Sequence, residues 1–374
     1  MRLSRSIVGQ QEADALSEVI FKDGYLGMGT QVARFEEEIA SFLNVPKEWV
    51  VCVSSGTAAL QLGLQAVIQP NDEVLVQSLT YVSSYQAISA IGAKPVSCEV
   101  KPETVTIDLL DAKTRLTKKT RAIMPVHYAS NPGDLNEIYE FSHKHKLRVI
   151  EDAAHAFGCN YKDKKIGSFG DIVCFSFDGI KNITSGEGGA VVTKDSNVAQ
   201  YVRNGRLLGV ENDTEKRLAG ERSWEFDVTK QGYRYHMNNL SATIGRVQLT
   251  RLSGEFAPKR IELASIYRKN LARISGIQLL NTQLGPIIPH IQPIRVLNGK
   301  RDELRLTLNS LDIQTGIHYK PNHLLSFYGK ENVSLPISEQ LYEELLSLPL
   351  HPGLTKDDVK QVCDAVIEFM NTNH

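Results

Sequence analysis

The sequence predicts an α/β protein in which a large domain with a mainly parallel sheet precedes a smaller α+β domain. Two observations predict this arrangement. In the first half of the chain, short apolar segments with strand character alternate with segments whose apolar residues recur at helical spacing. After about residue 245, long helical stretches and shorter strands replace this alternation. Because helices between consecutive strands require crossover connections, the alternating part is expected to form a parallel sheet.

The predicted elements of the large domain follow one another along the chain, separated by turn residues. Gly92, for example, is expected to end a helix. The predicted strands are 49–55, 71–79, 93–100, 120–128, 147–154, 171–177 and 189–193. The predicted helices are 11–21, 57–68, 83–92 and 134–146.

The pattern predicts a large domain over residues 1–245 and a small C-terminal domain over 246–374. The length of 374 residues agrees with about two domains, at ~150 residues for each domain. Helical spacing over 249–274 marks the start of the small domain, and the N-terminal segment could pack on either part. The polar, aperiodic segment 210–225 is expected to be a surface loop.

Composition and charge restrict the classes of function. The 42 basic and 43 acidic side chains leave a net charge of −1, which argues against a nucleic-acid-binding surface. The N-terminus lacks the apolar core of a signal peptide, and no run of ~18 apolar residues predicts a membrane span. The five cysteines show no zinc-ligand spacing, so no metal site is predicted. We therefore expect a soluble cytoplasmic protein without a membrane or nucleic-acid partner.

Polar residues gather where the predicted parallel strands end. Ligands of such sheets bind beyond the carboxyl ends of the strands, so these residues are expected to share one rim. They are Ser54–Thr57, Ser78–Tyr81, His127, Asp152–His155 and Ser176–Lys181.

The segment SSGTAAL (54–60) places a Ser-Gly-Thr turn between a strand and a helix. Free amides at a helix N-terminus attract anions, and Gly56 permits close approach of a phosphate, with Thr57 beside it. An ordinary helix cap would give the same sequence. Neither the Walker motif nor a GxGxxG fingerprint is present.

Asp152 follows a run of apolar residues, so burial would disfavour its charge unless a cation or a donor met it. A protonated pyridine nitrogen is such a cation, although helix capping or an arginine partner would also explain the residue. His155 could reach the same ligand, or it could simply be hydrogen-bonded at a strand end.

Lys181 lies between two apolar segments, in a stretch rich in glycine. A buried lysine has a lowered pKa and can act as a nucleophilic amine, whereas a solvated turn lysine would have no such role. Ser176 could donate its hydroxyl to a phosphate. Tyr81 could stack on a planar cofactor or belong to the core.

Taken together, these residues meet the needs of pyridoxal phosphate (PLP). Its phosphate requires hydrogen-bond donors, its ring nitrogen requires an acid, and its aldehyde requires a lysine. Phosphate donors, an aromatic ring, an acid, a hydroxyl and an amine occur in that order at the predicted strand ends.

The chain closely resembles the fold-type I PLP enzymes, and within them the nucleotide-sugar aminotransferases of the DegT/StrS type. The resemblance covers nearly the whole chain, and its most specific parts are EDAAHAFG (151–158) and FSFDGIKNITSGEGGAVVT (175–193). Further matching segments are 25–44, 54–60, 71–74, 125–135, 232–249, 316–323 and 347–355.

The resemblance implies a role for each motif residue. Lys181 would bond the cofactor's aldehyde and move the proton, and Asp152 would hold the pyridine nitrogen. His155 would lie by the cofactor's 3-hydroxyl. The phosphate would be bound by Gly56, Thr57 and Ser176, and Tyr81 would stack on the ring.

The family is dimeric, and a segment that usually reads GxNxR completes the partner's site. Here that segment reads GYRYH (232–236), so Arg234 replaces the asparagine expected at the phosphate. Arg234 would bind either the cofactor phosphate or the substrate. A second departure is Asp178, where many relatives have His or an aromatic residue.

The implied activity is transfer of the amino group of L-glutamate to a nucleotide-linked keto-sugar for cell-surface glycan biosynthesis. The sequence GEGG after the lysine resembles enzymes that aminate C-4 of a 4-keto-6-deoxyhexose. His318, Tyr319 and His323 match positions near the mouth of the active site, although a structured loop would explain them equally. Amination of a 3-keto sugar or a keto-cyclitol, and a non-catalytic regulator on the same fold, are the alternatives.

Overall fold

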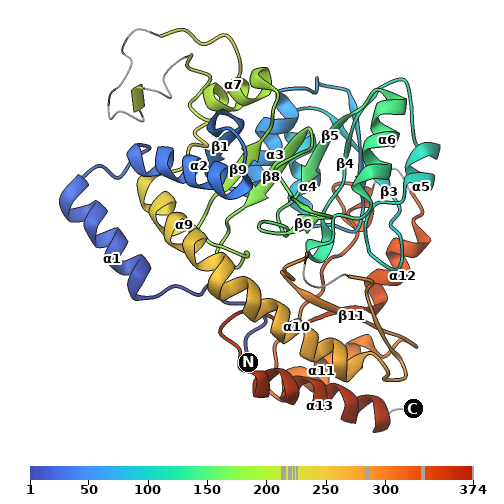
Figure 1. Cartoon of the computed structure of the whole chain (residues 1–374). Coiled ribbons are helices and arrows are strands. Elements are labelled where there is room, and N and C mark those ends of the chain that lie inside the picture. Colours follow the sequence, from blue (N-terminus) through green and yellow to red (C-terminus); the bar gives the residue numbers. More distant parts are fainter. Residues whose placement is uncertain are drawn as a thin grey trace.

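The computed structural model describes residues 1–211, 216, 217, 221, 224, 226–282, 286–329 and 333–372. Its largest sheet has seven strands in the order β1-β9-β8-β5-β4-β2-β3 (Figure 1). The strands are β1 (Val50–Val53), β2 (Glu73–Gln77), β3 (Lys94–Cys98), β4 (Thr120–Met124), β5 (Arg148–Asp152), β8 (Ile172–Ser176) and β9 (Gly189–Val192). A small hairpin is formed by β6 (Asn160–Tyr161) and β7 (Lys164–Lys165).

The large sheet is mainly parallel, as the sequence predicts. Strands β3, β2, β4, β5 and β8 pair in parallel, whereas β9 is antiparallel to both β8 and β1. All the predicted strands are present, each shorter than its apolar segment. Since the residues that follow β1, β2, β5 and β8 reach the same edge, the predicted rim exists.

Helices cover both faces of this sheet. In β1, Val51 and Val53 face α3, α4 and α7, while Val50 and Cys52 face α2 on the other side. Helices α5 and α6 continue the second layer over β2, β4 and β5 (Figure 1). The bounds are α2 (Thr30–Leu43), α3 (Gly56–Gln65), α4 (Val82–Ala90), α5 (Leu109–Thr114), α6 (Leu135–His145) and α7 (Ser196–Gly205).

A second, antiparallel sheet follows in the C-terminal third, with the strand order β10-β11-β12. Its apolar face packs on α10, α11 and α13 to form a separate core (Figure 1). The elements are β10 (Ile277–Leu279), β11 (Gln292–Val296), β12 (Leu345–Leu348), α10 (Ala257–Leu271), α11 (Arg301–Ser310), α12 (Pro336–Glu344) and α13 (Lys356–Thr372).

A long helical segment joins the two sheets. Helix α9 (Asn239–Arg251) continues through the π-helical turn η4 (Leu252–Phe256) into α10. The predicted domain boundary at residues 245 and 246 therefore falls inside α9. Helix α1 (Gln10–Glu18), extended by the π-helical η1 (Val19–Asp23), packs along α9.

The first residues of the chain join the C-terminal part instead. The backbone amide of Gln314 donates to the carbonyl of Met1 at 3.0 Å, and that of Leu350 donates to the carbonyl of Leu3 at 3.1 Å. Short 3-10 turns complete the fold at η2 (Lys47–Trp49), η3 (Tyr128–Ser130) and η5 (Asn322–Leu324).

Three sequence-based expectations concern a surface loop, membrane-spanning helices and the cysteines. Most of the predicted surface loop 210–225 lies outside the described residues. Among the helices that the structure describes, none is long and apolar enough to cross a membrane. All five cysteines are buried as free thiols.

Candidate active site

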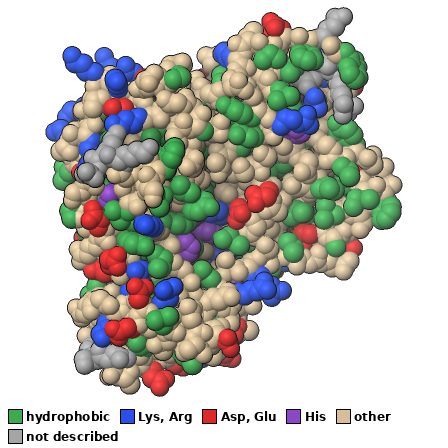
Figure 2. Space-filling view, turned by 180° about the vertical axis from the view of Figure 1, so that it is seen from behind, with side chains coloured by type: hydrophobic (Ala, Val, Ile, Leu, Met, Phe, Trp, Pro, Cys, Tyr) green, Lys and Arg blue, Asp and Glu red, His purple; other side chains and the backbone are tan. Residues whose placement is uncertain are grey.

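A cavity of about 470 Å³ opens at the rim where the parallel strands end. The space-filling view shows histidine side chains in a hollow near the middle of one face, with basic and acidic groups beside them (Figure 2). The residues that line the cavity are Ser55, Gly56, Thr57, Leu60, Thr80, Tyr81, Ser83, Val126, Asp152, Ala154, His155, Ser176, Asp178, Ile180, Lys181, Glu187, His318 and Tyr319.

One end of the cavity is built to receive an anion. Ser55 caps α3, since its hydroxyl accepts a hydrogen bond from the amide of Ala58 at 3.1 Å. The amides of Gly56 and Thr57 lie in the first turn of α3 and have no partner within the helix. A Cβ atom on Gly56 would lie 2.7 Å from the Cβ of Ser176, so only glycine lets α3 approach the end of β8.

Asp152 ends β5 and is only 4% exposed. Its Oδ2 accepts a hydrogen bond from the Ser84 hydroxyl at 2.7 Å, and its Oδ1 accepts one from the amide of Ala154 at 3.2 Å. These two donors fix the carboxylate at the cavity wall. Sequence reasoning missed Ser84, because its role depends on where α4 lies against β5.

Lys181 lies in the turn after β8, where its amide donates to the carbonyl of Asp178 at 3.1 Å. Within the described part of the chain, its side-chain amine has no hydrogen-bond or ion-pair partner. Burial lowers the pKa of this amine, while the charges of Asp178 and Asp152 partly oppose that shift. The amine is thus more easily deprotonated than that of an ordinary lysine, as a nucleophile requires.

His155 lies at the cavity wall beside Tyr319 and His290. Its Nε2 is 3.2 Å from the hydroxyl of Tyr319, and its ring centroid is 4.4 Å from that of His290. Burial, helped by the nearby charge of Lys181, holds the pKa of His155 well below its usual value. The ring is therefore neutral near pH 7, and its buried Nδ1 has no hydrogen-bond partner among the described residues.

The loop after α11 brings two further predicted residues into the cavity. Tyr319 packs against Tyr81, with ring centroids 5.6 Å apart, and Tyr81 itself is 57% exposed. His318 lies beside them, and burial together with Lys181 lowers its pKa to about 4. The C-terminal part of the chain thus supplies one wall of a site whose floor belongs to the large sheet.

Two predicted site residues do not line this cavity. Arg234 lines a separate cavity of about 90 Å³ with Arg217, His236 and apolar side chains. His323 is buried between the Ser78 hydroxyl, 2.7 Å from its Nδ1, and Glu339, 3.1 Å from its Nε2. Within one chain, His323 therefore anchors a loop, and Arg234 lies away from Lys181.

His127, Asp178 and the unpredicted acid Glu187 complete the description of the rim. His127 lies beneath the rim rather than in the cavity, with its Nε2 3.1 Å from the buried Glu151 carboxylate. Asp178 and Glu187 do line the cavity. Burial, followed by the charge of Asp178, raises the pKa of Glu187. The only sequence signal for Glu187 is its place among the glycines that follow Lys181.

The cavity fits pyridoxal phosphate. The first turn of α3 and Ser176 offer donors to a phosphate, Asp152 offers an oriented carboxylate, and Lys181 offers an unpaired amine. The unpartnered Nδ1 of His155 adds a donor or acceptor that a bound molecule would satisfy. The fold and the site together define a PLP-dependent enzyme of fold type I.

Comparison with known proteins agrees with this class. The chain is 34% identical to the UDP-4-amino-4-deoxy-L-arabinose–oxoglutarate aminotransferase of Shewanella sediminis, over 98% of this chain and 97% of that protein. It is 32% identical to the dTDP-4-dehydro-2,3,6-trideoxy-D-glucose 4-aminotransferase of Saccharopolyspora spinosa, over 97% and 95% of the two chains. Among solved structures, Spr1654 of Streptococcus pneumoniae in its PLP form superposes with a TM-score of 0.91 at 25% identity, covering 100% of this chain and 99% of the other.

Residues 7–367 match the DegT/DnrJ/EryC1/StrS aminotransferase family, and the chain belongs to this family. It is a PLP-dependent sugar aminotransferase, and its cofactor is pyridoxal phosphate.

Proposed function

We propose that this enzyme transfers the amino group of L-glutamate to C-4 of a nucleotide-linked 4-keto-6-deoxyhexose. The observation that carries the proposal is the unpaired, buried amine of Lys181 in the same cavity as the oriented carboxylate of Asp152. The position on the sugar is inferred from the names of the two relatives, both of which specify a 4-amino or 4-keto sugar.

Bound PLP supplies an aldehyde that condenses with amines and a ring that accepts electrons. In the proposed mechanism, Lys181 anchors the aldehyde at rest, and its freed Nζ then moves a proton to and from the substrate carbon. The lowered pKa of this amine favours its action as a base. Asp152 keeps a proton at the ring nitrogen, and Ser84 and Ala154 hold its two oxygens in position.

The remaining residues bind and orient in this proposal. Gly56, Thr57 and Ser176 donate to the phosphate. Tyr81 would stack on the ring, and the neutral His155 would contact the 3-hydroxyl through Nδ1, because Tyr319 already occupies Nε2.

His318 and Tyr319 line the same cavity, where they would contact the sugar in this assignment. His323 holds their loop rather than the substrate, since both of its ring nitrogens face protein groups.

A second copy of the chain is proposed to complete each site. Arg234 lies outside the cavity of its own chain, so a contact with the cofactor phosphate requires the Arg234 of another copy. Large apolar side chains are also exposed in two stretches of the chain, residues 8–21 and residues 208–228, the second of which precedes Arg234. They are Val8 (55%), Ile20 (50%), Phe21 (85%), Leu208 (46%), Trp224 (84%), Phe226 (60%) and Val228 (47%).

The direct test is a substrate panel with the purified holoenzyme and L-glutamate. The panel contains UDP-, dTDP- and GDP-linked 4-keto-6-deoxyhexoses, the matching 3-keto sugars and a keto-cyclitol, and products are identified by mass and NMR. The proposal predicts amination at C-4 and stoichiometric 2-oxoglutarate. Amination only at C-3 or only of the cyclitol would favour those alternatives, and no conversion of the bound cofactor by glutamate would favour a regulator.

A further inference from the structure

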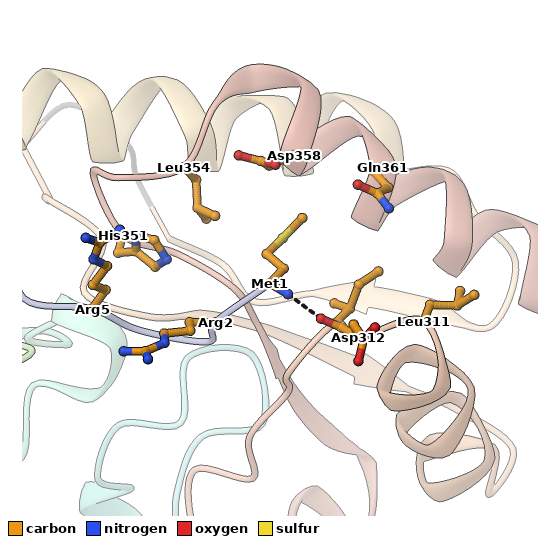
Figure 3. A pocket seen from close by; sticks show the side chains of 10 residues that line it. Met1, Arg2, Arg5, Leu311, Asp312, His351, Leu354, Asp358 and Gln361 are labelled. Atoms are coloured by element: carbon orange, nitrogen blue, oxygen red, sulfur yellow. Dashed lines mark hydrogen bonds between the residues drawn. The ribbon is translucent and has the colours of Figure 1, made fainter.

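A second cavity, of about 460 Å³, lies in the C-terminal part of the molecule and shares no lining residue with the active site (Figure 3). It is open to solvent and is bordered by the first residues of the chain, the turn after α11 and the N-terminal half of α13 (Figure 3). Its lining consists of Met1, Arg2, Arg5, Leu311, Asp312, Ile313, His351, Leu354, Asp358 and Gln361.

Two exposed arginines, Arg2 and Arg5, line the cavity. Within the residues that the structure describes, neither the Arg2 nor the Arg5 guanidinium makes an ion pair or a hydrogen bond. Two acids also line the cavity, but Asp358 already accepts a hydrogen bond from the amide of Thr355 at 2.7 Å and so caps α13. Asp312 remains beside the amino group of Met1, which donates to its backbone carbonyl (Figure 3).

His351 provides an independent sign of a missing ligand. Its side chain is only 4% exposed, and neither ring nitrogen has a hydrogen-bond partner in the part of the chain that the structure describes. The backbone of Arg2 lies near the ring, but without the geometry of a hydrogen bond. Burial lowers the pKa of His351, with further lowering by Arg260 and Arg5, so the ring is neutral and can donate one N–H. Buried polar atoms are normally paired, so a bound group in this cavity would satisfy the ring.

We infer that this cavity is a second ligand site, which binds a small molecule carrying a carboxylate or phosphate group on an apolar body. The forked guanidinium of Arg5 and the N–H of His351 would hold the anionic oxygens, as arginine does in most carboxylate and phosphate sites. The apolar body would lie against Met1, Leu311 and Leu354. The volume is within the range of small-molecule sites.

The test uses the holoenzyme, in which PLP already fills the phosphate end of the catalytic cavity. Inorganic phosphate and succinate are titrated separately, and binding is followed by calorimetry and by the NMR signal of the His351 ring. That signal is assigned by its loss in His351→Gln. A shift with phosphate alone, with succinate alone, or with both identifies the anion that the site accepts.

Arg5→Ala is expected to weaken binding at least about tenfold, which corresponds to the loss of one charge-assisted contact. Arg305→Ala removes the same charge from α11, where Arg305 pairs with Asp302 at 3.4 Å and lines neither cavity, so it is expected to bind normally. Thermal unfolding of each variant checks that it is folded. The inference is overturned if neither probe shifts the His351 signal, or if the two arginine variants weaken binding equally.

Discussion

At the scale of single residues, the carboxylate of Asp152 and the amine of Lys181 are both buried in the active site, but only the side chain of Asp152 is hydrogen-bonded by the described residues. Asp152 receives hydrogen bonds from Ser84 and Ala154, which stabilise a carboxylate despite burial. The amine of Lys181 has no such partner among the described residues, and burial lowers its pKa. Hydrogen bonds thus fix the carboxylate of Asp152, and burial makes the amine of Lys181 easier to deprotonate.

A methyl group added at Gly56 is expected to weaken the binding of PLP. In Gly56→Ala, the new Cβ would lie 2.7 Å from Ser176 Cβ, so α3 and the end of β8 must move apart. Overpacking of this size costs about 1–3 kcal/mol. Because the displaced turn carries the phosphate donors, the Kd for PLP is expected to rise by up to the same free energy, about five- to 160-fold. Spectroscopic titration of the apoenzyme with PLP measures this. Gly254→Ala, where a Cβ meets no atom within 4 Å, is the control. Equal PLP affinity in the two variants would contradict the assignment of this turn to the phosphate.

The buried histidines predict a loss of stability in mild acid. The pKa of His318 is lowered to about 4, and those of His155 and His290 lie well below the usual value. Below pH 6.5 the unfolded chain binds protons at these positions while the folded protein does not, so the free energy of unfolding falls as pH falls. Each such histidine contributes a slope of up to about 1.4 kcal/mol per pH unit.

Denaturant unfolding between pH 6.5 and pH 4 measures this slope. His318→Gln is expected to flatten it, while His143→Gln, on the exposed side of α6, is expected to leave it unchanged. Identical slopes in all three proteins would show that His318 does not titrate as its burial implies.

At the scale of elements, the loop that leads into η5 connects the C-terminal part of the chain to the rim of the large sheet. Asn322 is fully buried, and its Nδ2 donates to the carbonyls of Ser78 at 3.0 Å and Thr80 at 2.8 Å. These bonds clamp the loop that carries His318 and Tyr319 onto the segment after β2. The cavity wall therefore depends on a polar clamp outside the cavity.

Removing the clamp should loosen this wall. Asn322→Ala removes the donor to the buried Thr80 carbonyl and one donor to the Ser78 carbonyl, which still accepts from the backbone amides of Asn322 and Thr80. The free energy of unfolding is therefore expected to fall by about 1–3 kcal/mol, the cost of one unsatisfied buried acceptor. The KM for the sugar substrate is expected to rise as well, because Tyr319 loses its fixed position. Asn309→Ala, on the exposed surface of α11, is the control. A normal KM in Asn322→Ala would mean that this loop does not position the substrate.

The sequence predicts the strands and the rim well because each depends on local patterns. Apolar runs show where the strands are, and the ends of parallel strands lie at one edge of the sheet. The sequence therefore predicts that Gly56, Asp152 and Lys181 lie at the same rim. The antiparallel direction of β9 and the clamp at Asn322 depend on contacts across the fold, which local spacing does not encode. Arg234 differs again, because its proposed role involves a second chain.

At the scale of the whole molecule, the position of Arg234 predicts complementation between subunits. Lys181→Ala is expected to abolish turnover, and Arg234→Ala to weaken PLP binding about tenfold or more through loss of a charge-assisted contact. A mixed dimer of these two variants contains one site with both lesions and one site with neither. Doubly tagged mixed dimers should therefore regain about half of the wild-type activity at PLP concentrations that leave Arg234→Ala homodimers mostly unloaded. If Arg234 acts within its own chain, or has no part in the site, the mixed dimers gain nothing over the mean of the two parents.

The central claim is that Lys181 is the residue that holds the cofactor. Reduction of the PLP-loaded enzyme with borohydride, followed by peptide mapping, tests it most directly, because reduction makes the lysine–cofactor bond permanent. We predict one pyridoxyl group per chain, on the peptide that contains Lys181. A pyridoxyl group on another lysine, or on none, would contradict the account of this site.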